Sequence, residues 1–216
     1  MTDVRTEIKR PASRLRLYLA PVLLLVLAIL FSIGWLVVSR QVEARLDAMI
    51  SEEAAKGRSW SCDNRRVAGY PFRIEIECIN ARIKDSGPSQ NEARLSRLGA
   101  VAQVYDPTLI IIEAQGPLLV LSKEQPIASV EWSSLRSSVH ISGVQPDRLS
   151  ISGEGVSVKA QLNGQPSNLA FAHGEFHLRI KPENDRASNH LEFVTQVDGI
   201  SSDTMPGPVA KIEIAG

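Results

Sequence analysis

Residues 17–38 read LYLAPVLLLVLAILFSIGWLVV, and none of these 22 side chains is charged. A helix rises about 1.5 Å per residue, so this run extends about 33 Å, enough to cross a hydrocarbon core about 30 Å thick. We therefore predict a transmembrane helix over residues 17–38. This helix determines on which side of a membrane every other segment lies.

The charges on the two sides of this run are unequal. The first 39 residues carry five basic and two acidic groups, which leaves 19 of the 24 basic and 22 of the 24 acidic residues for the rest of the chain. Because excess Lys and Arg stays on the cytoplasmic side, residues 1–16 are predicted to be a cytoplasmic tail. The rest is predicted to be periplasmic, in a single-pass inner-membrane protein whose first partner is the lipid bilayer. The five basic residues are Arg5, Lys9, Arg10, Arg14 and Arg16.

A cleaved signal peptide is the alternative interpretation of this N-terminus. The apolar part of a signal is usually about 7–15 residues long and ends at a small-x-small site. The run in this chain is longer and continues through Trp35, Leu36 and Val37. Its length favours an uncleaved anchor, and both interpretations export the remainder of the chain.

Residues 39–57 show a helical pattern of a different kind. Val42, Leu46, Met49 and Ile50 recur at steps of three and four among acidic and basic residues, which is typical of an amphipathic helix. With no Pro or Gly before Gly57, the membrane helix is expected to continue outward as a stalk. The apolar stripe then packs either on the chain's own β domain or on a second copy or partner.

From residue 58 to 216 the pattern indicates β-structure. Phe72, Ile74, Ile76 and Cys78 alternate with charged residues, which predicts a strand with one wet face. Similar alternation recurs near residues 149, 156, 176 and 211, so we expect a mainly-β domain with a twisted or curved antiparallel meander sheet. Residues 115–117 and 153–155 are read as turns, and the apolar segments 109–112 and 118–121 as separate strands covered on both faces.

Cys62 and Cys78 are the only two cysteines of the chain. If they lie opposite each other on adjacent strands, the centre of the hairpin falls at Tyr70, within the turn-forming residues Gly69, Tyr70 and Pro71. This agreement predicts a buried structural disulfide, as expected for an oxidising compartment. Two free thiols, or a redox-active or metal-binding pair, are the alternatives.

Several of these motifs together resemble a known family. They are WSC at residues 60–62, GYPFRIE at 69–75, Cys78, AQVYDP at 102–107 and GP at 116–117. The chain from about residue 60 to 216 resembles the bacterial envelope proteins of domain-of-unknown-function family 2125. The resemblance implies a single N-terminal anchor, a β-rich exported domain and no known activity. Family members usually continue with more β-hairpins, so the family's C-terminal part is expected to be missing after Gly216, in a short member, a truncated gene product or a fragment.

His173, Glu175 and His177 are the one candidate metal site. Their spacing places all three side chains on the same face of a strand, and imidazole and carboxylate groups bind zinc. Apolar Phe176 and Leu178 occupy the other face, which makes the histidine face the solvent side of a half-buried strand. We therefore expect no metal and no cofactor.

The sequence gives no sign of catalysis or of nucleic-acid binding. No Gly-x-Ser-x-Gly nucleophile motif occurs, and no basic stripe with interleaved aromatic residues is present. We expect a non-enzymatic, membrane-anchored envelope protein that binds lipid or another envelope component on a one-sided apolar sheet. The alternative is a scaffold that binds another envelope protein through the stalk helix or the sheet edge.

Overall fold

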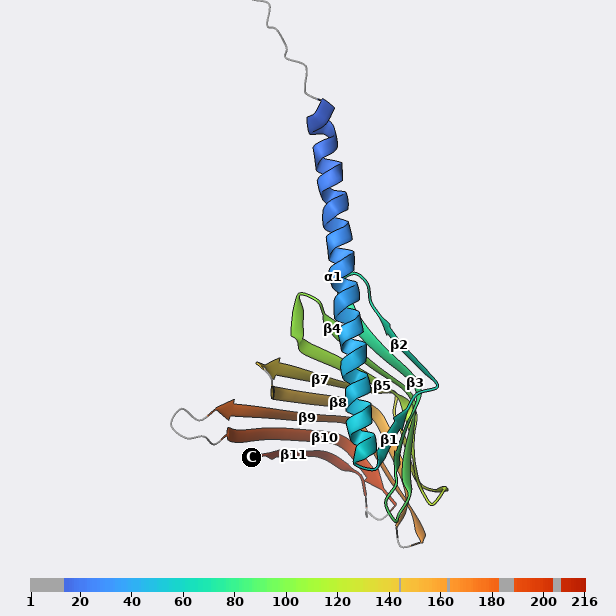
Figure 1. Ribbon diagram of the computed structural model, residues 1–216. Coiled ribbons are helices and arrows are strands. Elements are labelled where there is room, and N and C mark those ends of the chain that lie inside the picture. The colour runs from blue at the N-terminus through green and yellow to red at the C-terminus, as the bar shows by residue number, and fades with distance from the viewer. Residues whose placement is uncertain (1–13, 144, 163, 183–188, 204–206) are drawn as a thin grey trace, which may run out of the picture.

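The computed structural model describes residues 14–143, 145–162, 164–182, 189–203 and 207–216. It contains one long helix followed by an 11-stranded antiparallel sheet (Figure 1), so the predicted order of an apolar helix and an antiparallel β domain is confirmed. The predicted tail, residues 1–16, lies outside the described residues up to residue 13. The strands are β1 (Arg58–Ser61), β2 (Asn64–Ala68), β3 (Arg73–Asp85), β4 (Asn91–Gln103), β5 (Asp106–Ser122), β6 (Gln125–Glu131), β7 (Ser134–Ser142), β8 (Gln145–Leu162), β9 (Gln165–Pro182), β10 (Asn189–Ser202) and β11 (Val209–Ala215).

Helix α1 (Arg14–Ala55) includes the predicted transmembrane run and most of the predicted stalk without a break. It is long and apolar enough to cross a membrane. Gly57, at a φ of 82°, follows its end, where the Gly57 N–H bonds to the Ala54 carbonyl at 3.0 Å. A glycine adopts this left-handed conformation at little cost, which suits it to ending a helix. Figure 1 shows one half of α1 projecting beyond the sheet and the other half lying against it.

The strands follow one another in the sheet almost in chain order, β1-β3-β4-β5-β6-β8-β9-β10-β11. At two places in this order, a pair of short strands takes the position of one long strand. Both β1 and β2 pair with β3, and both β6 and β7 lie between β5 and β8. Strands β3, β5 and β8 therefore pair with a different neighbour at each end.

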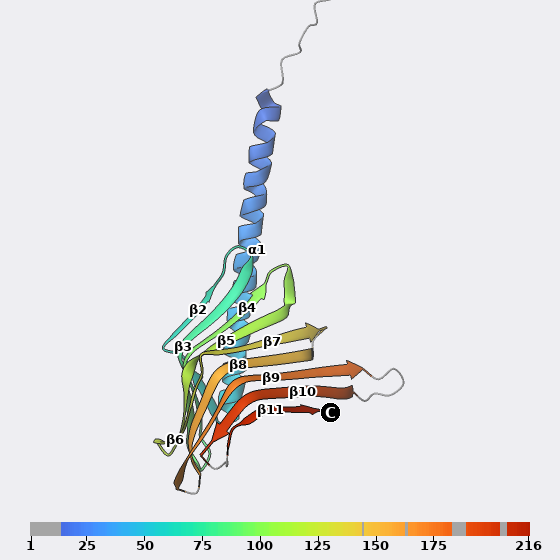
Figure 2. The same ribbon diagram turned by 180° about the vertical axis from the view of Figure 1, so that it is seen from behind.

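The long strands bend where this change of neighbour occurs (Figure 2). Pairing is interrupted there between Asn80 and Ser96, and again between Gly155 and Ala172. In β10 the interruption includes Gly199. Asn80, Gly155 and Gly199 have φ values of 50°, 58° and 66°, the left-handed conformation that glycine and asparagine tolerate best. We call Asn80, Ser96, Gly155, Ala172 and Gly199 the bend line.

The small buried core follows the bend line. Six hydrophobic residues of the described chain are buried, and four of them, Cys78, Ala81, Val156 and Ile200, flank it. In β3, apolar positions that are otherwise two residues apart are three apart at the bend, from Cys78 to Ala81. The additional residue keeps apolar side chains on the inner side of the sheet, since each residue added to a strand exchanges its two faces.

The bend corrects two predicted turns. Residues 153–155 lie inside β8 and residues 115–117 inside β5, so segments 109–112 and 118–121 belong to one strand. The same Gly and Pro residues that form hairpin turns also permit a bend within a strand. The expected covering of both faces is also wrong, because Ile111 is 45% exposed.

Cys62 and Cys78 form the predicted disulfide, with their Cα atoms 5.5 Å apart. They are not directly opposite, however, because Cys78 pairs with Arg65 and the hairpin register is shifted by three residues. Cys62 falls between β1 and β2, beside the bend line, so the bond connects the two sides of the bend. Closing a loop of this length contributes about 3 kcal/mol to stability.

Replacing Gly155 with alanine should destabilise the β domain. A Cβ at Gly155 would lie 2.5 Å from Ser133 Oγ, and the residue's φ of 58° disfavours any side chain. The expected loss is about 1–2 kcal/mol in the free energy of unfolding, measured by urea denaturation of the full chain in detergent. Gly207→Ala is the control, since nothing lies within 4 Å of its added Cβ. Equal stability of the two variants would contradict the role given to the bend.

Candidate functional site

The register of the sheet aligns apolar residues from strand to strand. In an antiparallel ladder, directly opposed residues have their side chains on the same face. Three adjacent rows in the part of the sheet before the bend are mostly apolar, two of them across eight strands and the third across seven, and only Ser137 and Thr195 interrupt them. We call this surface the apolar face. The rows run Cys78-Leu98-Ala114-Leu135-Gly153-Gly174-Val197-Ile212, Ile76-Ala100-Ile112-Ser137-Ile151-Phe176-Thr195-Ile214, and Ile74-Ala102-Ile110-Val139-Leu149-Leu178-Phe193.

The opposite surface, which we call the outer face, is more polar, although it includes the exposed Ile111 and Val194. One of its rows runs Glu77-Gly99-Glu113-Arg136-Ser152-Glu175-Gln196-Glu213. Ion pairs connect neighbouring strands there, such as Glu77 with Arg97 at 2.6 Å and Glu113 with Arg136 at 3.6 Å. The two faces differ as strongly as the alternation in the sequence predicts.

Little covers the apolar face. Helix α1 lies against β1 and β2, at one end of the sheet, while β7 to β11 extend away from it (Figure 1). No large side chain among the described residues is less than 2% exposed, and most large side chains of the three rows are half-buried. Ile214 is 52% exposed, and Leu191, in the next row of the same face, is 53% exposed. Soluble monomers rarely expose contiguous apolar surfaces of this extent, which usually mark a binding site.

A cavity of about 570 Å³ lies where α1 crosses the apolar face, within the size range of small-molecule sites. The helix contributes three of the four predicted stalk residues, Leu46, Met49 and Ile50, and Val42 is half-buried nearby. The disulfide forms part of the sheet side of the cavity. At its edge, Arg65 pairs with Asp47 at 2.6 Å. The main apolar lining residues are Leu46, Met49, Ile50, Trp60, Ile76 and Leu98.

The predicted hairpin turn lies beside α1. Gly69, at a φ of 100°, and the following Tyr70 and Pro71 connect β2 to β3. The Tyr70 hydroxyl is 2.8 Å from Ser32 Oγ, and the Trp35 indole N–H donates to the Arg73 carbonyl at 3.0 Å. The turn therefore reaches the helix within the uncharged run, and sequence reasoning did not predict this contact.

His173, Glu175 and His177 do come together, on the outer face, as ion pairs. His173 Nδ1 lies 2.7 Å from Glu154 Oε1 and its Nε2 lies 3.2 Å from Glu175 Oε1. Hydrogen bonding to Glu154, then to Glu175, raises the pKa of His173. An imidazole that donates from both nitrogens has no lone pair for a metal. Among the described residues, no group of three such side chains has the arrangement of a metal site.

The model of one protein family matches residues 35–215, and its description is "Uncharacterized protein conserved in bacteria (DUF2125)". The chain belongs to this family. In this DUF2125 protein the match begins inside the uncharged run and includes the stalk and the β domain. A search of the curated proteins and of the solved structures gives no match.

The His173 cluster predicts a pH-dependent contribution to stability. A raised pKa means that the contribution is fully present below the unfolded-state pKa of about 6.5 and is lost as the pH rises through the folded-state pKa. Glu154→Gln should therefore destabilise the β domain more at pH about 5.5 than at pH about 8.5. Urea unfolding at both pH values measures this, with Glu213→Gln as an exposed control. A pH-independent effect of Glu154→Gln would show that the pair does not form.

Proposed function

We propose that this protein is a single-pass, inner-membrane protein of bacteria that binds lipid acyl chains on the apolar face, without catalysing a reaction. The positive N-terminus supports a cytoplasmic tail. The Cys62–Cys78 disulfide supports a periplasmic β domain, because such bonds persist in oxidising compartments.

The proposal is carried by the continuity of the three apolar rows across seven to eight strands, combined with the incomplete burial of most of their large side chains. A water-exposed apolar surface of this length is unfavourable by about 25 cal/mol for each Å². An elongated apolar ligand that crosses the strands would cover it. Acyl chains have this shape, and the membrane supplies them.

The cavity under α1 is a suitable place for one end of such a chain. Met49 and Ile50 of the helix face Ile76 and Leu98 of the sheet across it. Methionine adapts to ligands of varied shape because its side chain is unbranched and polarizable. The Arg65–Asp47 ion pair at the edge provides polar groups beside the opening. A chain held here continues onto the half-buried apolar rows of β7 to β10 and the exposed Ile212 and Ile214 of β11.

Adjacent isoleucines of β5 test this proposal. Ile112 belongs to the apolar face and Ile111, which is 45% exposed, to the outer face. A photoreactive benzophenone side chain at position 112 should capture lipid in cells, whereas one at position 111 should capture roughly tenfold less, because successive side chains of a strand point to opposite faces. Mass spectrometry of the purified adducts identifies what is captured. Equal lipid capture at both positions would contradict the proposal.

A scaffold that binds another envelope protein is the second candidate function. It is supported by β11, which pairs with β10 along one edge and with no other described strand along the other. Its inward side chains Ile212 and Ile214 are exposed. Such an edge can accept a strand from another chain. Protein adducts in place of lipid adducts at position 112 would favour this function over lipid binding.

A further inference from the structure

The tip of the β domain nearest the N-terminal half of α1 is aromatic. Tyr70 and Phe72 of the β2–β3 turn are 56% and 67% exposed, and Tyr105 of the β4–β5 turn is 76% exposed. The two turns are joined by a hydrogen bond from the Val104 N–H to the Phe72 carbonyl at 2.9 Å. We call Tyr70, Phe72 and Tyr105, with the intervening Pro71, the aromatic tip.

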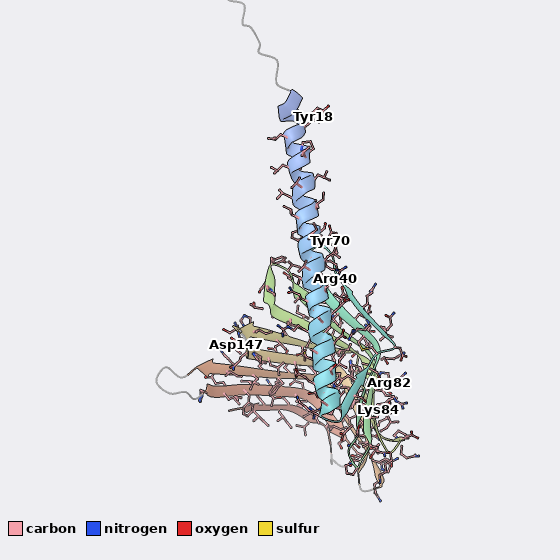
Figure 3. The ribbon with its side chains drawn as sticks, viewed as in Figure 1. Tyr18, Arg40, Tyr70, Arg82, Lys84 and Asp147 are labelled. Carbon is pink, nitrogen blue, oxygen red and sulfur yellow. A yellow bond between two sulfur atoms is a disulfide. The ribbon has the colours of Figure 1, made fainter. Side chains whose placement is uncertain are left out.

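The aromatic tip packs on α1 at a defined height. The ring centroids of Phe31 and Phe72 are 6.1 Å apart, and those of Trp35 and Tyr70 are 5.5 Å apart with the planes nearly perpendicular. Figure 3 shows Tyr70 farther toward the N-terminal end of α1 than Arg40, the first charged residue after the uncharged run. The tip is thus beside residues that the membrane should contain.

The length of the uncharged run fixes this relation. Residues 17–30 precede the first residue that contacts the tip, Phe31. They rise about 21 Å along the helix axis, which is less than the thickness of a hydrocarbon core, about 30 Å. A hydrocarbon core that begins at residue 17 therefore ends at about residue 36, which places Trp35 at its edge and Phe31 within it. Moving it toward the N-terminus to avoid the tip would place Arg14 and Arg16 in hydrocarbon, which is costly.

The composition of the tip suits the boundary between lipid headgroups and acyl chains. Tyrosine and tryptophan are enriched at this depth because each has an apolar ring and a polar group. Arg73 and Asp106, which follow the two turns, bring charged groups of both signs that headgroups accommodate. Arg73 pairs with Glu75 at 3.1 Å, and Asp106 accepts from the Thr108 hydroxyl.

We infer that the aromatic tip inserts through the headgroup layer to the edge of the acyl chains of the bilayer that α1 spans, as a second membrane contact of the β domain. This inference rests on the proposed membrane anchor. The row Ile74-Ala102-Ile110 of the apolar face follows directly behind the tip. Insertion therefore brings one end of the apolar face to the membrane surface, where acyl chains can enter it without crossing water.

Photolabelling from the bilayer tests this inference with the wild-type chain. The full chain is reconstituted in phosphatidylcholine vesicles that contain a phospholipid with a diazirine near its glycerol, and labelled residues are mapped by mass spectrometry. Label is expected on α1 and on the aromatic tip. Ile127, an exposed apolar residue near the start of β6 and away from α1, is the internal control and should carry on the order of tenfold less label than the tip.

The possible failures are distinguishable. Label on α1 without label on the tip would overturn the inference and leave the membrane anchor intact. A tip labelled no more than Ile127 would have the same meaning. Absence of label from α1 would overturn the anchor and, with it, this inference.

Discussion

The bend in the long strands is the constraint on which the rest of this structure depends. A strand has two faces, and one additional residue exchanges them. A strand that bends can keep its apolar side chains on the inner side by making this exchange at the bend. The three-residue steps from Cys78 to Ala81, from Gly153 to Val156 and from Val197 to Ile200 do this.

The other features fix this bent sheet relative to helix α1. The Cys62–Cys78 disulfide connects the two sides of the bend at the end of the sheet next to α1. The Gly57 carbonyl accepts from the Ser86 N–H at 2.8 Å and ties the end of the helix to the end of β3. At the other end of β3, the aromatic tip packs on Phe31 and Trp35. The helix therefore contacts both ends of one strand, so the apolar face keeps a definite orientation to it.

The sequence alone predicts the elements better than their connections. The uncharged run, the Leu46-Met49-Ile50 stripe and the alternation around Ile76 are local patterns, and they correctly predict the helix, three cavity residues and a one-sided sheet. The role of Gly155 cannot be predicted from neighbouring residues, because its left-handed backbone conformation occurs both in hairpin turns and in bends within a strand. The three-residue shift in the cysteine hairpin depends on how β1 and β2 share β3. The contact of Tyr70 with the helix joins residues 38 positions apart, although aromatic residues beside a Pro-containing turn were a usable signal.

Counting bound lipids tests most directly whether acyl chains occupy the apolar face. Leu191 and Val194 lie in β10 on opposite faces and are 53% and 41% exposed. Native mass spectrometry of the full chain, released from mild detergent, counts the phospholipids that stay bound to each variant. Helix α1 is the same in all of these proteins. A buried carboxylate is disfavoured beside acyl chains, so Leu191→Glu should keep fewer lipids than wild type, and Val194→Glu should keep the wild-type number. Equal numbers in all three proteins would contradict the account.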